Sequence, residues 1–144
     1  YSIMYADGIY LRSGTSGVGS IGTMLTLVDH SEYDKKEGVK YIGLYADTSP
    51  EKNKAYRDSL KGNYDTYKAE ILNPFDNVFN QDAIAARGHK IDLSKEDVTK
   101  GRTYIGQNSA GKPSSIEVGL ADGIASFEEV IQMAYNAGMA QRNA

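Results

Sequence analysis

Short β-type runs alternate with helix-type stretches along this chain, and that alternation limits the possible folds more than any other feature of the sequence. Residues 8–11, 39–45 and 102–105 are rich in β-branched and aromatic side chains, a composition that favours strands. Glycine-rich or charged segments separate these runs from stretches with helical spacing. Strands that alternate with helices indicate an α/β layer fold.

The longest helical signal begins after Glu51, where apolar side chains recur at three- and four-residue steps among charged ones. This spacing predicts an amphipathic helix. Asn73 and Pro74 interrupt the stripe, and they either start a second helix that Gly88 ends or kink a single helix. The residues of the first stripe are Tyr56, Leu60, Tyr64, Tyr67 and Ile71.

Two further helices are predicted in the second half of the chain. Residues 94–100 are typical of a short capped helix, with Gly101 as its stop. The last helix follows Ser126, which forms a capping box with Glu129 ahead of an apolar face. No internal repeat or low-complexity segment separates these elements.

Composition excludes several classes of function. The chain has 144 residues, 16 basic and 19 acidic side chains, a net charge of −3 and no cysteine. It therefore has no disulfide scaffold, thiol nucleophile or cysteine-ligated metal. The scattered lysines and arginines form no basic face for a phosphate backbone, and no apolar run approaches the ~20 residues of a membrane span. We expect no nucleic-acid binding and no membrane segment in this chain.

One glycine motif and one tyrosine-lysine pair suggest nicotinamide chemistry. Residues 17–22 match the G-x-G-x-x-G dinucleotide fingerprint, although the fingerprint also needs a preceding strand and an acid about 20 residues later. Tyr64 and Lys68 have the spacing of the tyrosine and lysine in short-chain dehydrogenases. The same residues have simpler explanations. The glycines fit a structural turn, and Tyr64 and Lys68 fit a helix with one core face and one solvated face.

The histidines and lysines offer different chemistry. His30 and His89 are isolated in polar surroundings, so we expect no metal site. Lys52 and Lys54 lie between the predicted strand at 39–45 and the long helix. A lysine whose pKa is lowered by burial can serve as general base for a serine, whereas the ordinary role of a lysine at a helix start is solvent exposure.

Several segments, in a fixed order, resemble the serine-lysine peptidases, the family of bacterial signal peptide peptidase A and the related phage prohead proteases. The resemblance covers essentially the whole chain. The tyrosine-rich sequence is most similar to the short phage or prophage members. The segments are Tyr1 to Asp7 with Ile9-Tyr10, the Gly19-Ser20-Ile21-Gly22 turn, residues 38–45, residues 49–54, the strand from Gly101-Arg102 to Gly106, and Gly119-Leu120-Ala121-Asp122.

The resemblance implies a crotonase-like, ClpP-like layered α/β fold, of which residues 1–144 form the C-terminal portion of one peptidase domain. It implies a nucleophilic serine just before Tyr1, with Lys52 as general base and Lys54 as the second choice. Ser20 would orient that lysine, unless it is a turn serine bonded to local backbone. Glycine amides before Tyr1 would form the oxyanion hole. On these grounds the isolated chain is expected not to cleave peptides.

The same resemblance implies peptide or protein substrates, a homo-oligomeric ring, no cofactor, and a location in the cytoplasm or the phage prohead, with a membrane anchor allowed before Tyr1. Residues 107–118 exceed the usual length of the family, with an insertion expected at 112–115. The alternative is a non-catalytic assembly fragment or degenerate homologue. A crotonase-type acyl-coenzyme A enzyme lacks a recognisable acyl-binding signature here, and a nicotinamide oxidoreductase comes last.

Overall fold

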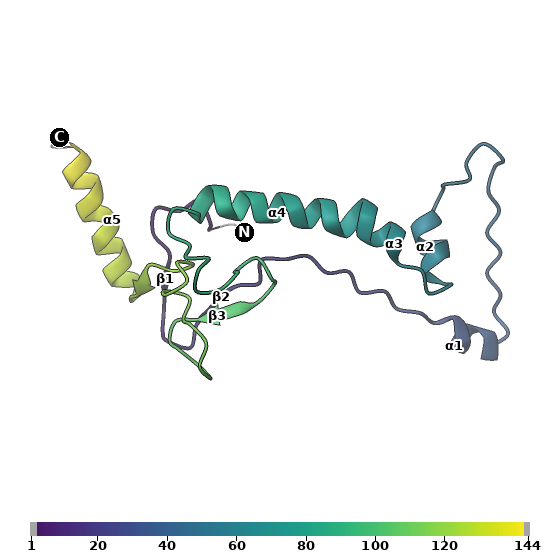
Figure 1. The fold of residues 1–144 in the computed structure, drawn as a ribbon, viewed down its shortest axis with the longest axis horizontal. Coiled ribbons are helices and arrows are strands. Elements are labelled where there is room, and N and C mark those ends of the chain that lie inside the picture. The colour runs from purple at the N-terminus through teal and green to yellow at the C-terminus, as the bar shows by residue number, and fades with distance from the viewer. Residues whose placement is uncertain (1–2, 143–144) are drawn as a thin grey trace. The chain divides into compact units, whose positions relative to one another are not determined.

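The computed structural model describes residues 3–142, and the chain divides into two compact units, unit 1 (Tyr1–Gly22 and Val78–Ala144) and unit 2 (Thr23–Asn77). The elements are labelled in Figure 1. In chain order they are β1 (Tyr10–Leu11), β2 (Gly17–Gly19), α1 (Ser31–Lys36), α2 (Lys54–Ser59), α3 (Asp65–Tyr67), the π-helical turn η1 (Lys68–Leu72), α4 (Asn73–Arg87), β3 (Thr103–Ile105), β4 (Gly123–Ile124) and α5 (Phe127–Arg142).

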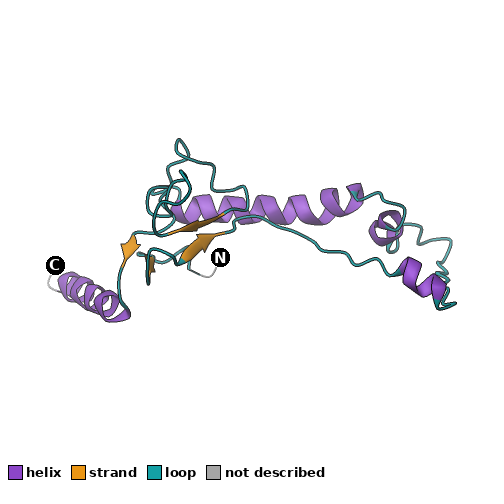
Figure 2. Ribbon diagram, turned by 90° about the horizontal axis from the view of Figure 1, so that it is seen from below, coloured by secondary structure: helices purple, strands orange, loops and turns teal. Residues whose placement is uncertain are grey.

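The four strands of the described region form two small sheets in unit 1. β1 and β4 are parallel, with Tyr10 opposite Gly123. β2 and β3 are antiparallel, with Val18 opposite Tyr104, and Figure 2 shows this pair side by side. The strands predicted at 8–11 and 102–105 are thus confirmed over the residues of β1 and β3.

The core of unit 1 consists of two adjoining clusters of buried side chains. Val18 packs against both, which places β2 between them. Burial of each valine, leucine, isoleucine or methionine side chain in them stabilises the unit by about 1.5–3 kcal/mol. The larger cluster contains Met4, Ile21, Ala83, Val98, Tyr104, Val118 and Leu120, and the smaller contains Ile9, Leu11 and Ala121.

The segment expected as an insertion begins in a hairpin. Ser109 and Lys112 form an antiparallel bridge. The two residues between them, Ala110 and Gly111, have φ values of 51° and 72°, the left-handed pair that a type I′ turn requires. Ser115 follows and is fully buried, with its amide donating to the Ile105 carbonyl at 2.8 Å. The segment that follows the hairpin is therefore anchored to the last residue of β3.

Unit 2 has no buried side chain among residues 23–77. Its two ends are joined by polar contacts of Thr23, whose amide donates to Asp76 Oδ1 at 2.9 Å and whose hydroxyl donates to the Leu72 carbonyl at 3.1 Å. Extended chain lies on both sides of α1 (Figure 1). Local hydrogen bonds, rather than a hydrophobic core, define the conformation of this unit.

The strand predicted at 39–45 is wrong for this structure. None of the described strands pairs with this segment, and Leu44 is 90% exposed. The apolar alternation of a strand becomes a sheet only when a neighbouring strand completes its backbone hydrogen bonds. Within residues 3–142 no such neighbour lies against it.

The long helix is divided differently from either prediction. Gly62, with φ of 78°, separates α2 from α3. The chain then stays helical through Asn73 and Pro74, because η1 precedes them and the Asn73 amide donates to the Lys68 carbonyl. A π-turn adds the extra residue that lets a helix pass a proline without a break. The chain is therefore helical without a break from Asp65 to Arg87, but a single helix that begins after Glu51 is not formed, because Gly62 interrupts it.

The two helices predicted in the second half have opposite outcomes. Residues 94–100 form turns, because Asp97 accepts from the Thr99 amide at 3.0 Å and from its hydroxyl at 2.6 Å, which competes with helix formation. The capping box of α5 is confirmed: the Ser126 amide donates to Glu129 at 2.7 Å and the Glu129 amide donates to Ser126 Oγ at 3.2 Å.

None of the helices within residues 3–142 has the length and apolar composition needed to cross a bilayer.

Gly119 and Gly111 provide a matched test of this packing. Both have left-handed φ values, 79° and 72°, but a Cβ on Gly119 would overlap the Lys90 carbonyl, whereas a Cβ on Gly111 meets nothing within 4 Å. We expect Gly111→Ala to lower the free energy of unfolding by about 1–2 kcal/mol. Gly119→Ala should lower it by roughly a further 1–3 kcal/mol through overpacking. Urea unfolding followed by circular dichroism measures both, and equal losses would contradict the packing described here.

Candidate functional site

Four of the segments that carried the family resemblance belong to unit 1, whereas residues 38–45 and 49–54 belong to unit 2. β1 follows the first segment and pairs with β4, which follows Asp122. The Ser20 turn and the strand after Gly101 are joined by two backbone hydrogen bonds: Ser20 N–H to the Arg102 carbonyl at 2.7 Å, and Gly101 N–H to the Ile21 carbonyl at 2.8 Å. Regions far apart in sequence therefore form one connected framework.

Asp122 is the centre of that framework. Its Oδ2 accepts from the Ile9 amide at 2.7 Å and from Arg87 Nη1 at 3.0 Å, and its Oδ1 accepts from Lys90 Nζ at 2.6 Å. The Asp122 amide donates back to the Ile9 carbonyl at 2.7 Å. Arg87 also donates to the Gly119 carbonyl at 3.0 Å. One carboxylate thus links β1, the end of α4 and the turn before β4.

The charges at this centre are largely removed from water. The side chain of Arg87 is 4% exposed and that of Asp122 is 19% exposed. Burial acts to raise the pKa of Asp122, but the hydrogen bonds from Arg87, Lys90 and the Ile9 amide outweigh it and hold that pKa far below its usual range. A carboxylate so paired is held as the anion, which suits a structural tie rather than proton transfer.

Ser20 lies at the end of β2 with a left-handed φ of 55°. It is exposed, so its hydroxyl faces away from the core while its amide is fixed by β3. An L residue held in this conformation costs about 1–3 kcal/mol. The position is compatible with the orienting role implied by the resemblance and also with a turn serine.

Lys52 and Lys54 lie in unit 2, at the start of α2. Lys52 is exposed in the turn before the helix, and its amide donates to the Ser49 carbonyl at 3.2 Å. The Lys54 amine lies 3.5 Å from the Glu51 carboxylate. Ser20 belongs to unit 1, so the serine and the lysines are each described within their own unit. Tyr1, next to which the nucleophile is expected, lies outside the described residues.

Arg102, the arginine of the Gly-Arg-aromatic segment, connects a carboxylate to an aromatic ring. Its Nη1 donates to the two Glu96 oxygens at 2.5 and 2.7 Å. Its guanidinium lies 4.9 Å from the centre of the Tyr104 ring. Burial, followed by the nearby Glu96 charge, raises the pKa of the Tyr104 phenol. These contacts fix the start of β3, next to which Ser20 is held.

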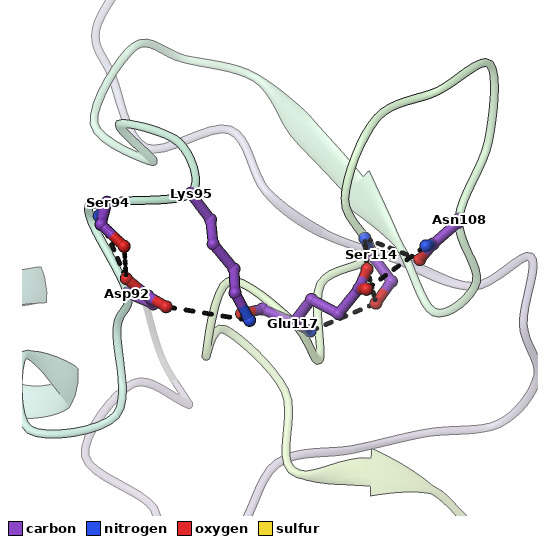
Figure 3. Close-up of polar contacts among 6 residues, drawn as sticks. All are labelled: Asp92, Ser94, Lys95, Asn108, Ser114 and Glu117. Atoms are coloured by element: carbon purple, nitrogen blue, oxygen red, sulfur yellow. Dashed lines mark hydrogen bonds and ion pairs between the residues drawn. The ribbon is translucent and has the colours of Figure 1, made fainter.

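A second polar cluster holds the segment that leads to Gly119 (Figure 3). Glu117 Oε2 accepts from the Ser114 amide at 2.8 Å, and the Glu117 amide donates to Ser114 Oγ at 3.2 Å. The hydrogen bond from the Ser114 backbone amide has the largest effect on the pKa of Glu117, which it lowers, and the Ser114 side chain lowers it further. Lys95 Nζ donates to the Glu117 carbonyl at 3.2 Å and lies 3.7 Å from Asp92. The cluster connects two surface loops and positions the turn that carries Asp122.

The residues that suggested nicotinamide chemistry do not form such a site. Residues 17–19 are strand β2, and the fully described stretch from there to α1 at Ser31 contains no helix, so the glycines do not lead into the helix N-terminus that a pyrophosphate needs. Tyr64 and Lys68 are both exposed, and they are joined only through their backbone, Lys68 N–H to the Tyr64 carbonyl at 3.0 Å.

His30 and His89 are exposed. Across residues 3–142, the histidine and carboxylate side chains form no group of three that would hold a metal ion.

Sequence reasoning missed Arg87, although it is the most buried charged residue of the framework. Its signal was present: Phe79, Ala83 and Arg87 are spaced by four residues and lie on one face of α4. An arginine on the apolar face of a helix indicates a buried partner. Asp122 was identified as part of a motif, but not as that partner.

No protein-family model matches this chain, and a search of curated proteins finds no match either.

Asp122→Asn tests the framework. The substitution leaves Arg87 buried without its counter-charge, so we expect the free energy of unfolding at pH 7 to fall by about 3 kcal/mol. Glu32→Gln, which neutralises an exposed acid in α1, should change it by less than about 0.5 kcal/mol. Thermal or urea unfolding of the full chain measures both, and equal effects would contradict a central role for Asp122.

The same pair predicts a pH dependence. The folded-state pKa of Asp122 is depressed, so its stabilisation is complete above the unfolded value of about 3.9 and is lost as the pH falls below it. The stability difference between the native chain and Asp122→Asn should therefore shrink from pH 6 towards pH 2. A difference that stays constant over this range would show that the charge of Asp122 is not what stabilises the unit.

Proposed function

We propose that this chain is the C-terminal portion of a serine-lysine endopeptidase domain with a crotonase-like fold. Lys52 is its general base, with Lys54 as the second choice, and Ser20 orients the lysine. The nucleophilic serine, by the same resemblance, precedes Tyr1. The domain hydrolyses peptide bonds in extended segments.

The chemistry follows from the two catalytic groups. The serine oxygen attacks the peptide carbonyl while the neutral lysine amine accepts the serine proton. The resulting ammonium then gives that proton to the leaving amine, and an acyl-enzyme remains. Water, deprotonated by the same amine, releases the acyl group and restores the serine. Neither a metal nor an organic cofactor takes part in this scheme.

The observation that carries the proposal is the pairing, within unit 1, of four of the resemblance segments. The Ser20 turn is bonded to the strand that follows Gly101, and β1 is bonded to the segment around Asp122. Segments that mark one family are expected to be neighbours if they serve one domain, and a chance set of short motifs carries no such expectation. The exposure of Ser20 leaves its hydroxyl open to a lysine.

The substrate class and assembly of the domain belong to the same proposal. Phage scaffold or capsid precursors are the substrates that fit the similarity of the sequence to the phage members. Signal peptides are the substrates of the cellular members. We accordingly assign the protein to a prohead interior or the cytoplasm, as a homo-oligomeric ring. Exposed apolar side chains on α5, such as Phe127 at 72% and Ile131 at 53% exposure, provide surface for contacts between subunits.

The same apolar exposure favours a second candidate, a non-catalytic assembly role. Met24, Val28 and Ile42 of unit 2 are each at least 70% exposed, and exposed apolar side chains of this kind are available for contacts with other subunits. In this case the serine before Tyr1 would be replaced by another residue, and the chain would act only through its contacts with other subunits.

Substitution of the two lysines tests the enzymatic proposal. In the complete protein, Lys52→Ala should lower kcat for hydrolysis of an extended peptide by about 10²–10⁴-fold, the loss expected for a general base. Lys54→Ala, which removes a lysine paired with Glu51, should retain most of the activity. A fluorogenic peptide assay measures both variants.

Loss of activity in Lys54→Ala with retention in Lys52→Ala would transfer the role of base to Lys54. A complete protein that has no serine before Tyr1 and cleaves no peptide would support the assembly role instead.

A further inference from the structure

Arg57 makes two contacts that hold the segment in front of α2. Its guanidinium carbon lies 4.6 Å from the centre of the Tyr45 ring. A terminal nitrogen, Nη2, donates a hydrogen bond to the carbonyl of Pro50. All three residues belong to unit 2. One side chain of α2 therefore contacts the segment at Tyr45, near its start, and again at Pro50, in its middle.

The Tyr45 ring also lies close to Gly43. A Cβ added to Gly43 would lie 3.0 Å from ring carbon Cε2, so the ring folds back over the glycine backbone. The ring thus has both Gly43 and the guanidinium of Arg57 as close neighbours. We call this arrangement of Gly43, Tyr45, Pro50 and Arg57 the Arg57 clamp.

From Tyr45 to the start of α2, the segment is held by local turns. The Ser49 amide donates to the Ala46 carbonyl at 2.9 Å, the Lys52 amide to Ser49 at 3.2 Å, and the Lys54 amide to Glu51 at 3.1 Å. Asn53 has a left-handed φ of 56°. Isolated turns of this kind are marginal in water, and loops with few buried contacts open readily. The clamp links this segment to helix α2 through a side chain.

We propose that Arg57 is a positioning residue that sets the conformation of the segment carrying Lys52. This inference rests on the proposed function, in which Lys52 is the general base. A base must stay within hydrogen-bond reach of its serine, and misplacement by about 1 Å costs up to 10²-fold in rate. Arg57 does not touch the reacting atoms. It restricts the backbone from which the lysine projects.

Arginine suits this role better than lysine. Its planar guanidinium stacks on an aromatic face and still presents N–H groups at its edge to a carbonyl. The two contacts of the clamp use these two properties, with Tyr45 under the face and Pro50 at the edge. A lysine at position 57 can satisfy one of them at a time, so Arg57→Lys should behave nearly as Arg57→Ala does.

Hydrogen exchange tests the clamp without any enzymatic assay. In the full chain, NMR exchange of the Ser49, Lys52 and Lys54 amides should be about tenfold faster in Arg57→Ala than in the native chain, as expected for a local opening. Tyr45→Phe keeps the ring and should keep native exchange, whereas Tyr45→Leu should match Arg57→Ala. Lys61→Ala removes an exposed charge from the turn after α2 and serves as the matched control.

A second NMR measurement protects the result against misfolded variants. The side-chain protons of Arg57 should show an upfield ring-current shift in the native chain and in Tyr45→Phe, and lose it in Tyr45→Leu. Native exchange in Arg57→Ala, or acceleration as large in Lys61→Ala, would overturn the clamp. So would the absence of a ring-current shift in the native chain.

Kinetics of the complete protein connect the clamp to catalysis. Arg57→Ala and Tyr45→Leu should each lower kcat by about 10–10²-fold with little change in KM, and Tyr45→Phe should retain native kcat. Faster exchange with unchanged kcat would overturn the positioning role. If the native complete protein cleaves no peptide, the proposed function fails and the catalytic role of Arg57 fails with it. The exchange measurements then report on the clamp alone.

Discussion

The structure of unit 1 depends on one nearly buried ion pair. Arg87 and Asp122 are 35 positions apart in the sequence, and the same carboxylate also accepts from Lys90 and from the Ile9 amide. β1 and β4 contain only two residues each, too few to hold a sheet by backbone hydrogen bonds alone. Asp122 supplies the additional bonds that keep them paired. Ile9, Leu11 and Ala121, which adjoin these contacts in the sequence, form the smaller apolar cluster.

Unit 2 follows a different physical rule. It has no buried side chain among residues 23–77, so its conformation rests on turns, on the contacts of Thr23 at its base, and on the stacking of Tyr45 and Arg57. Such contacts are individually weak in water. Each one therefore matters more to its own neighbourhood than an equivalent contact in unit 1. This is why a single arginine is able to govern the segment that contains Lys52.

Sequence reasoning succeeded where the signal was local. The capping box joins Ser126 and Glu129, which are close together in the sequence. The strand around Tyr104 has a clear strand composition. It failed at residues 39–45, because a strand needs a partner that periodicity does not reveal. It also failed at 94–100, where Asp97 bonds to Thr99 and so favours a turn. The pairing of Arg87 with Asp122 was out of reach, since spacing on one helix cannot identify a partner on a distant turn.

The candidate site was predictable only in part. Ser20 was located in a glycine turn from its neighbours, and the turn is present with Ser20 in a left-handed conformation. Nothing in the sequence around Lys52 indicated that Arg57 lies against Tyr45. That contact joins residues 12 positions apart with opposite chemical character. From residue type alone, Tyr45 is expected in a core and Arg57 on the solvated surface.

The capped helix α5 has a consequence for how the protein melts. It has a complete capping box, yet none of its 16 residues is fully buried. Its helicity therefore depends on caps, on short-range pairs such as Gln132 with Asn136, and on intrinsic propensity, which are marginal for a helix of this length. Loss of α5 on heating is not coupled to the collapse of the core. A helical signal would decline gradually before the cooperative transition, so a single melting temperature does not describe the whole chain.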